Sequence, residues 1–419
     1  MERMLRSGLS LRLLVVTPAV AIFLSSMLVN VGNLGFNMIF SRLMGPELFG
    51  QLAFLLTLKL SVLSLFGAAQ MAVSHLVSDC EPRGRGALLA GLSVLTRQVF
   101  VLLSLVFLFA AIALWLWLGT TALPPVLLFA ALPFGAAFSV LRGVSFGAMH
   151  TGAIILSANL EMGVRLIGAL LAWQLGLGLS GVAGAIALSI IAGWAVVRRE
   201  LPAPAQPVEL SGLIRSLGLG GAAFALLQLA QVLALDGDIF LARSLLSAED
   251  GGLIAALSLS QRIQFFACFS LATVLLPDLT RARRTGQPVI VALRPVGILF
   301  GAVSIAVLCA TTMVPEWLTD LLVGPQYRAA APLLRLAALS AIAFTLSYLI
   351  ATALMAFGDR RGIWICLTVA VVQLAAMALI PEPHLSGFVM IKVSCQLAAC
   401  GISLLLFAVR LKCSLLTTR

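Results

Sequence analysis

Apolar runs of about twenty residues or more follow one another along almost the whole chain, with only short polar gaps between them. A helix needs roughly 20 apolar residues to cross the hydrocarbon core of a bilayer. Charged residues make up only 10% of the chain, against about 25% in an ordinary soluble domain. Too few polar side chains remain to cover a surface that faces water. The sequence therefore predicts an all-α polytopic membrane protein, with the lipid bilayer as its solvent.

Twelve such runs are separated by gaps that contain proline, glycine or charged residues. The predicted spans cover residues 13–40, 48–76, 88–118, 122–148, 152–176, 179–197, 213–236, 252–277, 288–313, 330–357, 361–380 and 386–409. The first 30 residues resemble a signal peptide, but the apolar run continues to Phe40, and this length favours a retained helix. We expect a six-helix lobe over 1–200, a cytoplasmic linker over 201–212 and a second six-helix lobe over 213–419.

Lysine and arginine residues are distributed unequally between the two ends of the predicted spans. With the N-terminus in the cytoplasm, seventeen of them lie in cytoplasmic segments, whereas Arg42, Arg243, Arg328 and Arg335 lie on the other side. Cytoplasmic loops of membrane proteins are enriched in these residues. The bias predicts that both termini are cytoplasmic. It also explains the net charge of +11 without a nucleic-acid partner, because the basic residues form no single patch.

The chain also resembles itself at an offset of about 200 residues. Residues 43–53 (LMGPELFGQLA) align with residues 245–255 (LLSAEDGGLIA), and shorter matches around residues 152–181 align with residues 358–387. The matches place spans 1 and 2 on spans 7 and 8, and spans 5 and 6 on spans 11 and 12. Six is an even number, so the two repeats have the same orientation across the membrane. Two six-helix repeats around a central path are typical of secondary transporters.

Motifs for nucleotide binding or catalysis are absent from the sequence. It contains no GxxxxGK[ST], no GxSxG and no HExxH. The seven cysteines show no metal-type spacing and there are only three histidines, so we expect neither a metal nor a cofactor. A membrane glycan polymerase would need a sizeable outer loop, and the outer gaps at 236–251 and 315–331 are short. We therefore expect a transporter without ATP chemistry rather than an enzyme.

Five ionisable side chains fall well inside the predicted spans, where a charge costs several kcal/mol and faces a cavity or a partner. They are Lys59, Glu161, Arg165, Arg262 and Lys392. The four cations are the predicted substrate-binding residues, since a cationic cavity favours an anionic group such as a diphosphate. Two alternatives remain open: Glu161 and Arg165, spaced i, i+4, can pair with each other, and Lys392 can extend to the outer surface. Arg97 and Arg142 are expected to extend toward the cytoplasmic interface.

Further polar residues are candidates for the cavity or for ion coupling, together with Glu161. Asn30, Asn33 and Asn37 share one face of the first span, where amides either line a cavity or bind a neighbouring helix. Asp236 and Asp238 stand at the predicted outer end of span 7. They either bind a coupling cation or are solvated charges at a helix end.

Three segments carry a resemblance to a known family. They are FNMIFSRLMGPELFGQLAF (residues 36–54), LGLSGVAGAIAL (residues 177–188) and the segment from Leu233 to Arg281, which ends in LLPDLTR. In this order they resemble the polysaccharide exporters and O-antigen-type flippases of the multidrug/oligosaccharidyl-lipid/polysaccharide superfamily, whose fold is MATE-like. The chain departs from the family in Gly252-Leu253-Ile254, where a tyrosine usually follows the glycine and an aliphatic residue.

The resemblance implies two lobes that rock about a central cavity. It implies a bacterial inner-membrane flippase that moves an oligosaccharide, linked through diphosphate to a polyprenyl lipid, for the assembly of surface polysaccharide. The implied partners are this anionic lipid-linked glycan and polysaccharide polymerase or synthase subunits. Two alternatives are a cation-coupled multidrug exporter of the same fold and a non-transporting scaffold of a polysaccharide synthase complex.

Overall fold

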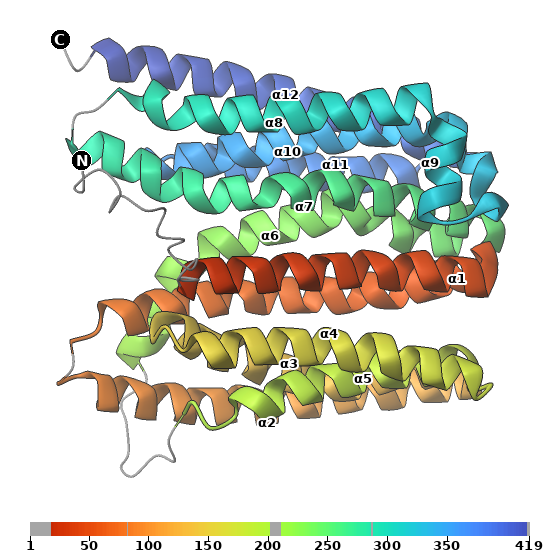
Figure 1. The fold of residues 1–419 in the computed structure, drawn as a ribbon, viewed down its shortest axis with the longest axis horizontal. Helices are drawn as coiled ribbons and strands as arrows, with labels where there is room; N and C mark the ends of the chain where they lie inside the picture. The colour runs from red at the N-terminus through yellow and green to blue at the C-terminus, as the bar shows by residue number, and fades with distance from the viewer. Residues whose placement is uncertain (1–17, 82, 202–210, 286–287, 417–419) are drawn as a thin grey trace, which may run out of the picture.

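The computed structural model describes residues 18–81, 83–201, 211–285 and 288–416, and within these ranges all secondary structure is helical. The long helices lie side by side, roughly along one common direction, which is horizontal in Figure 1. In chain order they are α1 (Pro18–Asp79), α2 (Arg85–Leu118), α3 (Leu123–Gly147), α4 (Thr151–Gln174), α5 (Gly178–Val197), α6 (Ser211–Leu245), α7 (Ala248–Thr285), α8 (Val289–Met313), α10 (Leu334–Ala356), α11 (Arg361–Ala378) and α12 (Leu385–Leu416). Three short elements complete the fold: η1 (Gly119–Ala122), α9 (Pro315–Leu322) and η2 (Pro325–Leu333).

The first helix contains two membrane spans. Its chain reverses direction at Gly45 (Figure 1), whose φ of 73° and ψ of 173° are not helical. Glycine adopts a positive φ without steric cost, and Pro46 suits the first turn of the returning helix because it needs no amide donor there. With α1 counted twice and the eight-residue α9 left out, the helices give the twelve predicted spans.

The two gaps at 236–251 and 315–331 were predicted to be loops, and the structure shows that both are largely helical. The helix α6 continues past Asp236 to Leu245, and α7 begins at Ala248, so that only a two-residue turn separates them. The other gap is not a loop either, because it folds into α9 and η2. In the first case the apolar residues Ile239–Leu241 continue the helix beyond the aspartates, which are buried rather than solvated.

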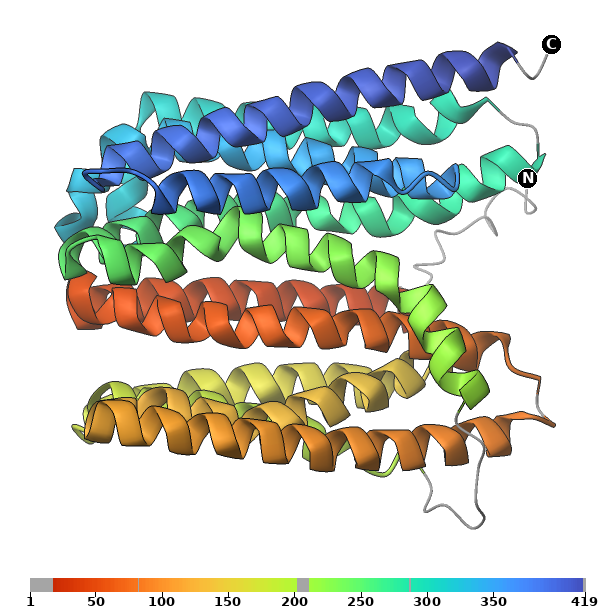
Figure 2. The same ribbon diagram turned by 180° about the vertical axis from the view of Figure 1, so that it is seen from behind.

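The helix α1 lies between two groups of helices, as Figure 2 shows. On one side it packs against α3 and α4, and on the other against α6 and α7. The first turns of α6 cross to the first group, because Leu213 and Leu217 join a cluster with Val73, Val77 and Leu92. Most of the predicted linker 201–212 lies outside the described residues.

The two repeats touch through equivalent glycines at the end of the bundle that carries α9. Gly50 and Gly252 are related by the offset of 202 residues seen in the sequence. A Cβ on Gly252 would lie 2.1 Å from the main-chain oxygen of Pro46, and one on Gly50 would lie 3.0 Å from the nitrogen of Gly252. The backbones of α1 and α7 are therefore in direct contact, and only glycine fits at position 252 without a shift.

Side chains close the same end of the bundle. The Arg42 guanidinium, beside the Gly45 turn, donates to the main-chain oxygens of Asp320 at 2.9 Å and Leu321 at 2.6 Å. The buried Tyr327 hydroxyl donates to the Ser41 carbonyl at 3.1 Å. We call these five residues the outer clasp, after the side on which the basic residues predict this end of the bundle to lie. The clasp connects α9 and η2, which belong to the second repeat, to the residues just before the chain reversal at Gly45 in the first repeat.

The glycine contact gives a test of the fold. We expect Gly252→Ala to destabilise the protein by about 1–3 kcal/mol, because overpacking forces two backbones apart. Gly251→Ala is the matched control, since a Cβ there meets no atom within 4 Å, and helix propensity favours alanine by up to about 1 kcal/mol. Thermal unfolding of the two variants in detergent measures the difference. Equal melting temperatures would contradict the close contact.

Candidate functional site

Three ion pairs lie inside the bundle, away from both of its ends. They join Lys59 Nζ to Glu161 Oε1 at 2.9 Å, Arg262 Nε to Asp236 Oδ1 at 2.8 Å, and Lys392 Nζ to Asp238 Oδ2 at 2.7 Å. At 1.5 Å per residue, Lys59 is about 21 Å along the helix from Gly45, and Asp238 is about 10 Å from the end of α6. Each pair connects two helices that are distant in the sequence, with the exception of the α6–α7 pair.

The first pair joins the second span of α1 to α4. The side chains of Lys59 and Glu161 are 7% and 19% exposed. Glu161 therefore pairs with Lys59, and not with Arg165 one turn away on its own helix. Arg165 instead donates from Nη2 to the side-chain oxygen of Asn33 and lies 5.7 Å from the ring centre of Phe36. The interior of the first repeat thus holds Lys59 and Arg165 together.

A third cation belongs to the same region. Arg142 lies within electrostatic reach of Glu161, and its guanidinium is 5.3 Å from the ring centre of Phe138. Its Nε is buried and has no partner. The expectation that Arg142 extends to the interface is wrong, because aromatic rings cover it inside the bundle. We call Lys59, Arg142, Arg165 and Glu161 the cationic cluster, and it carries two positive charges in excess.

The asparagine stripe reaches this cluster at one position. Asn33 accepts the bond from Arg165, and its main-chain oxygen accepts a bond from the Asn37 amide at 2.8 Å. Asn30 is exposed. The structure therefore places Asn33 beside the candidate site, with Asn37 one turn further along α1.

Arg262 links the two repeats at mid-depth. It is held by Asp236 from α6, and its Nη2 donates to the Thr57 hydroxyl on α1 at 2.9 Å. Thr57 is two residues from Lys59, so the same turn of α1 contacts the second repeat and carries the first ion pair. Thr57 could not be predicted as a contact residue, because a lone threonine in an apolar helix gives no signal of a partner.

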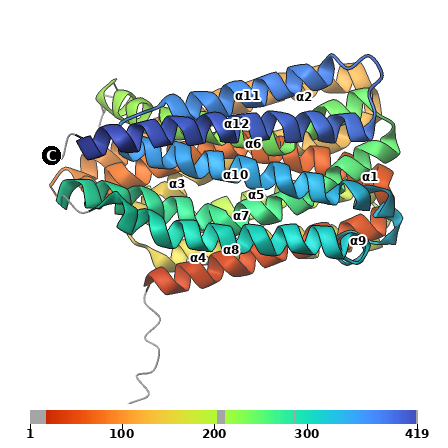
Figure 3. The same ribbon diagram turned by 90° about the horizontal axis from the view of Figure 1, so that it is seen from above.

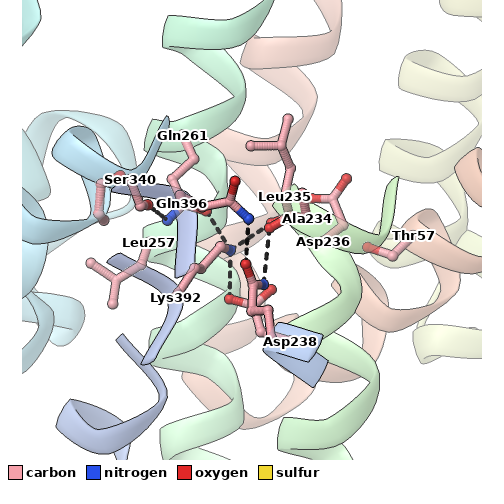
Figure 4. A network of polar contacts seen from close by, with 12 residues as sticks. Thr57, Ala234, Leu235, Asp236, Asp238, Leu257, Gln261, Ser340, Lys392 and Gln396 are labelled. Carbon is pink, nitrogen blue, oxygen red and sulfur yellow. Dashed lines mark hydrogen bonds and ion pairs between the residues drawn. The ribbon is translucent and has the colours of Figure 1, made fainter. Parts of the chain in front are cut away.

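Lys392 is the centre of a buried polar network in the second repeat (Figure 4). Its ammonium group donates to the Leu235 carbonyl at 2.7 Å, to Asp238 at 2.7 Å and to the Gln261 side chain at 2.6 Å. Gln261 in turn donates to the Ser340 hydroxyl at 3.0 Å. An ammonium group has three donors, and all three are used. The side chain is 2% exposed, so in this structure Lys392 neither extends outward nor has a donor for a substrate.

The two aspartates of α6 are buried. Asp236 is 0% and Asp238 4% exposed, and the reading of them as solvated end charges is wrong. They point to different sides, toward Thr57 and toward Lys392 (Figure 4). One carboxylate oxygen of each, Oδ2 of Asp236 and Oδ1 of Asp238, is buried without a hydrogen-bond partner.

The balance of buried charge consequently differs between the repeats. The five ionisable residues predicted inside the spans comprise four cations and one anion, and Asp236 and Asp238 are not among them. In the second repeat Arg262 and Lys392 are matched by two carboxylates. Of these interior ion-pair regions, the cationic cluster of the first repeat is the one with a surplus of positive charge. Among the described residues there is also no group of three or more His, Cys, Asp or Glu side chains that could hold a metal ion.

No family model matches the chain, and no curated protein matches it in sequence. Solved structures match its fold over almost the whole length. A multidrug resistance MATE family transporter of the MOP superfamily in an inward-facing conformation is 14% identical, with a TM-score of 0.75, and the match covers 92% of this chain and 95% of that one. An outward-facing structure of such a transporter gives 16% identity, a TM-score of 0.62 and coverage of 94% and 96%.

A third neighbour is a MOP superfamily transporter from Pyrococcus furiosus, described as having a binding pocket of reverse polarity that suggests a different function. It is 16% identical, with a TM-score of 0.61 and coverage of 94% of both chains. These likenesses define the fold class. The protein is a polytopic α-helical membrane protein with the twelve-helix, two-repeat architecture of MATE and MOP transporters.

The Lys392 network gives a stability prediction. Lys392→Met should destabilise the protein by about 3–5 kcal/mol, because it leaves the Asp238 carboxylate buried without a counter-charge. The double variant Lys392→Met/Asp238→Asn should regain much of this loss, since no buried charge remains unpaired. Thermal unfolding in detergent compares the three proteins. A double variant no more stable than the single one would show that the ion pair is not the source of the effect.

Proposed function

We propose that the protein is a flippase whose substrate carries a diphosphate, namely a polyprenyl-diphosphate-linked oligosaccharide used in surface polysaccharide assembly. The observation that supports this proposal is the cationic cluster. An uncompensated charge inside a membrane protein costs several kcal/mol, and this cluster holds a surplus of two. A diphosphate brings negative charges that offset the surplus, and guanidinium groups bind phosphate oxygens in a bidentate manner.

Each member of the cluster has a role in this proposal. Lys59 and Arg165 contact the diphosphate, and Arg142 attracts it electrostatically without touching it. Glu161 holds Lys59 in place while the site is empty, and Asn33 orients Arg165. The Lys59 ammonium group can exchange Glu161 for a phosphate, because it makes one hydrogen bond to Glu161. The Lys392 ammonium group, by contrast, makes three hydrogen bonds.

Alternating access fits the contacts that close one end of the bundle. The outer clasp and the Gly50–Gly252 contact close the end that carries α9. The match to the inward-facing transporter has the higher TM-score, 0.75 against 0.62 for the outward-facing one. In the proposed cycle the substrate enters from the cytoplasmic face of a bacterial inner membrane, the face on which the basic residues predict both chain termini, and release requires the clasp to open. Polymerase or synthase subunits would receive the glycan outside.

One other function has specific support, and a second is distinguished by what it predicts. Multidrug export is favoured by the names of the structural neighbours and by the unpartnered oxygens of Asp236 and Asp238, which are acceptors suited to a coupling cation. One neighbour is described as having a pocket of reverse polarity that suggests a different function. This description supports the use of the charge of the pocket, rather than the fold, to infer the substrate. A scaffold in a synthase complex would need no interior cations at all. This alternative therefore predicts that substitution of the interior cations leaves function unchanged.

The flippase proposal is tested by the sidedness of lipid-linked glycans. Spheroplasts that lack the gene should accumulate polyprenyl-diphosphate glycans on the inner face, out of reach of an impermeant glycan-modifying reagent. The double variant Lys59→Met/Glu161→Gln removes the ion pair, and leaves the surplus of two charges, on Arg142 and Arg165, unchanged. We expect it to reduce export about ten- to a hundredfold, since a charge-assisted hydrogen bond contributes about 1.5–3 kcal/mol.

Arg199→Gln is the control, because Arg199 is exposed at the end of α5 and should leave export unchanged. The amount of each variant in the membrane is measured by immunoblot. Normal outward exposure of the glycan with the neutral double variant would contradict the proposed binding site.

Drug sensitivity separates flippase from multidrug exporter. A strain without the gene should show unchanged susceptibility to a panel of lipophilic cations, because a cationic site repels them. Increased sensitivity that is reversed by the wild-type gene, and not by its Asp236→Asn variant, would instead favour the cation-coupled exporter.

A further inference from the structure

A groove lies between α11 and α12, on the outside of the second repeat. These two helices pack side by side at the edge of the bundle (Figure 3). The groove has a volume of about 440 Å³ and is lined by Arg361, Trp364, Thr368, Val369, Ile402 and Leu406. Trp364 is 55% and Ile402 49% exposed, so the groove opens away from the helix bundle, where lipid surrounds the protein. From Arg361 to Val369 it extends about 12 Å into the membrane.

Cations lie near the end of the groove where α11 begins. Arg360 and Arg361 are exposed at the start of α11, and Arg410 lies on α12 one turn beyond Leu406, which lines the groove. Arg361 and Arg410 share one carboxylate, because Asp359 accepts from the Arg361 guanidinium at 2.6 Å and lies within electrostatic reach of Arg410. The Arg361 guanidinium holds the pKa of Asp359 below its ordinary value. The carboxylate therefore stays ionised, and a surplus of two positive charges remains.

One of these cations is incompletely bound. The Arg410 Nη2 reaches the Phe357 carbonyl at 3.4 Å, which is a long contact. Its Nε is buried and has no hydrogen-bond partner. A buried guanidinium N–H without an acceptor is costly, and a phosphate oxygen is an acceptor of the right kind.

We propose that this groove binds an anionic phospholipid of the cytoplasmic leaflet, with its phosphate between Arg361 and Arg410 and one acyl chain along the apolar lining. The cytoplasmic leaflet carries the negative lipids, and basic pockets between transmembrane helices on that side bind their head groups. Trp364 stands one turn below the arginines, at the level where indole rings sit in the membrane interface. The site is separate from the cationic cluster, which lies in the first repeat, so it does not depend on the transported substrate.

Native mass spectrometry of the full-length protein in detergent tests the proposal. The protein is titrated with an equimolar mixture of phosphatidylglycerol and phosphatidylcholine, and the retained adducts of each are counted. We expect a preference for phosphatidylglycerol that falls about fivefold for each of Arg361→Gln and Arg410→Gln, since a basic residue near the membrane surface contributes about that factor. Arg199→Gln, an exposed arginine at the same end of the first repeat, should leave the preference unchanged.

A second variant separates the groove from general surface charge. Thr368→Trp fills the groove with an indole while all the arginines stay in place. It should reduce the retention of phosphatidylglycerol, and because Thr368 is exposed it should not alter the melting temperature. It also keeps the test valid if Arg410→Gln proves unstable. Equal retention of the two lipids by the wild-type protein, or unchanged retention by Thr368→Trp, would overturn the proposal.

Discussion

Charged side chains inside a bilayer need partners, and this requirement fixes how the helices of the protein face one another. Apolar contacts alone orient transmembrane helices weakly, because lipid tails are as apolar as leucine. The ion pair between Lys59 and Glu161 sets the rotation of α1 against α4. The pair between Lys392 and Asp238 does the same for α12 and α6. Close glycine contacts between α1 and α7 then set how near the two repeats approach.

The two repeats share a scaffold but use its polar interior differently. The offset of 202 residues places Lys59 on Gln261, so both repeats have a polar side chain at the same point of equivalent helices. In the second repeat Gln261 helps to saturate Lys392, and the two buried cations are matched by two carboxylates. In the first, Lys59 has a single carboxylate partner, and two further cations, Arg142 and Arg165, remain in surplus. This difference in charge is why the proposed substrate site is placed in the first repeat.

Much of the architecture can be predicted from the sequence, and much of the site cannot. The spans follow from hydropathy, because each is set by its own residues, and the repeat follows from short matches. The charge pairs depend on partners more than 100 residues away, as for Lys59 and Glu161, and local patterns carry no such information. Hydropathy ended the seventh span at Asp236, although the apolar residues Ile239–Leu241 indicated a longer helix. The outer clasp depends on main-chain carbonyls, which have no signature in sequence at all.

The separation of the paired charges along the chain also constrains its synthesis. Glu161 follows Lys59 by 102 residues, which takes about 5–20 s at a translation rate of roughly 5–20 residues per second. For that time the second span exists with an ammonium group and without its counter-ion. In the other half the interval between Asp238 and Lys392 is 154 residues, and the awaited lysine lies on the last helix. The ion pair of each half can therefore form only after its second member has been synthesised, which in the second half is Lys392 on α12.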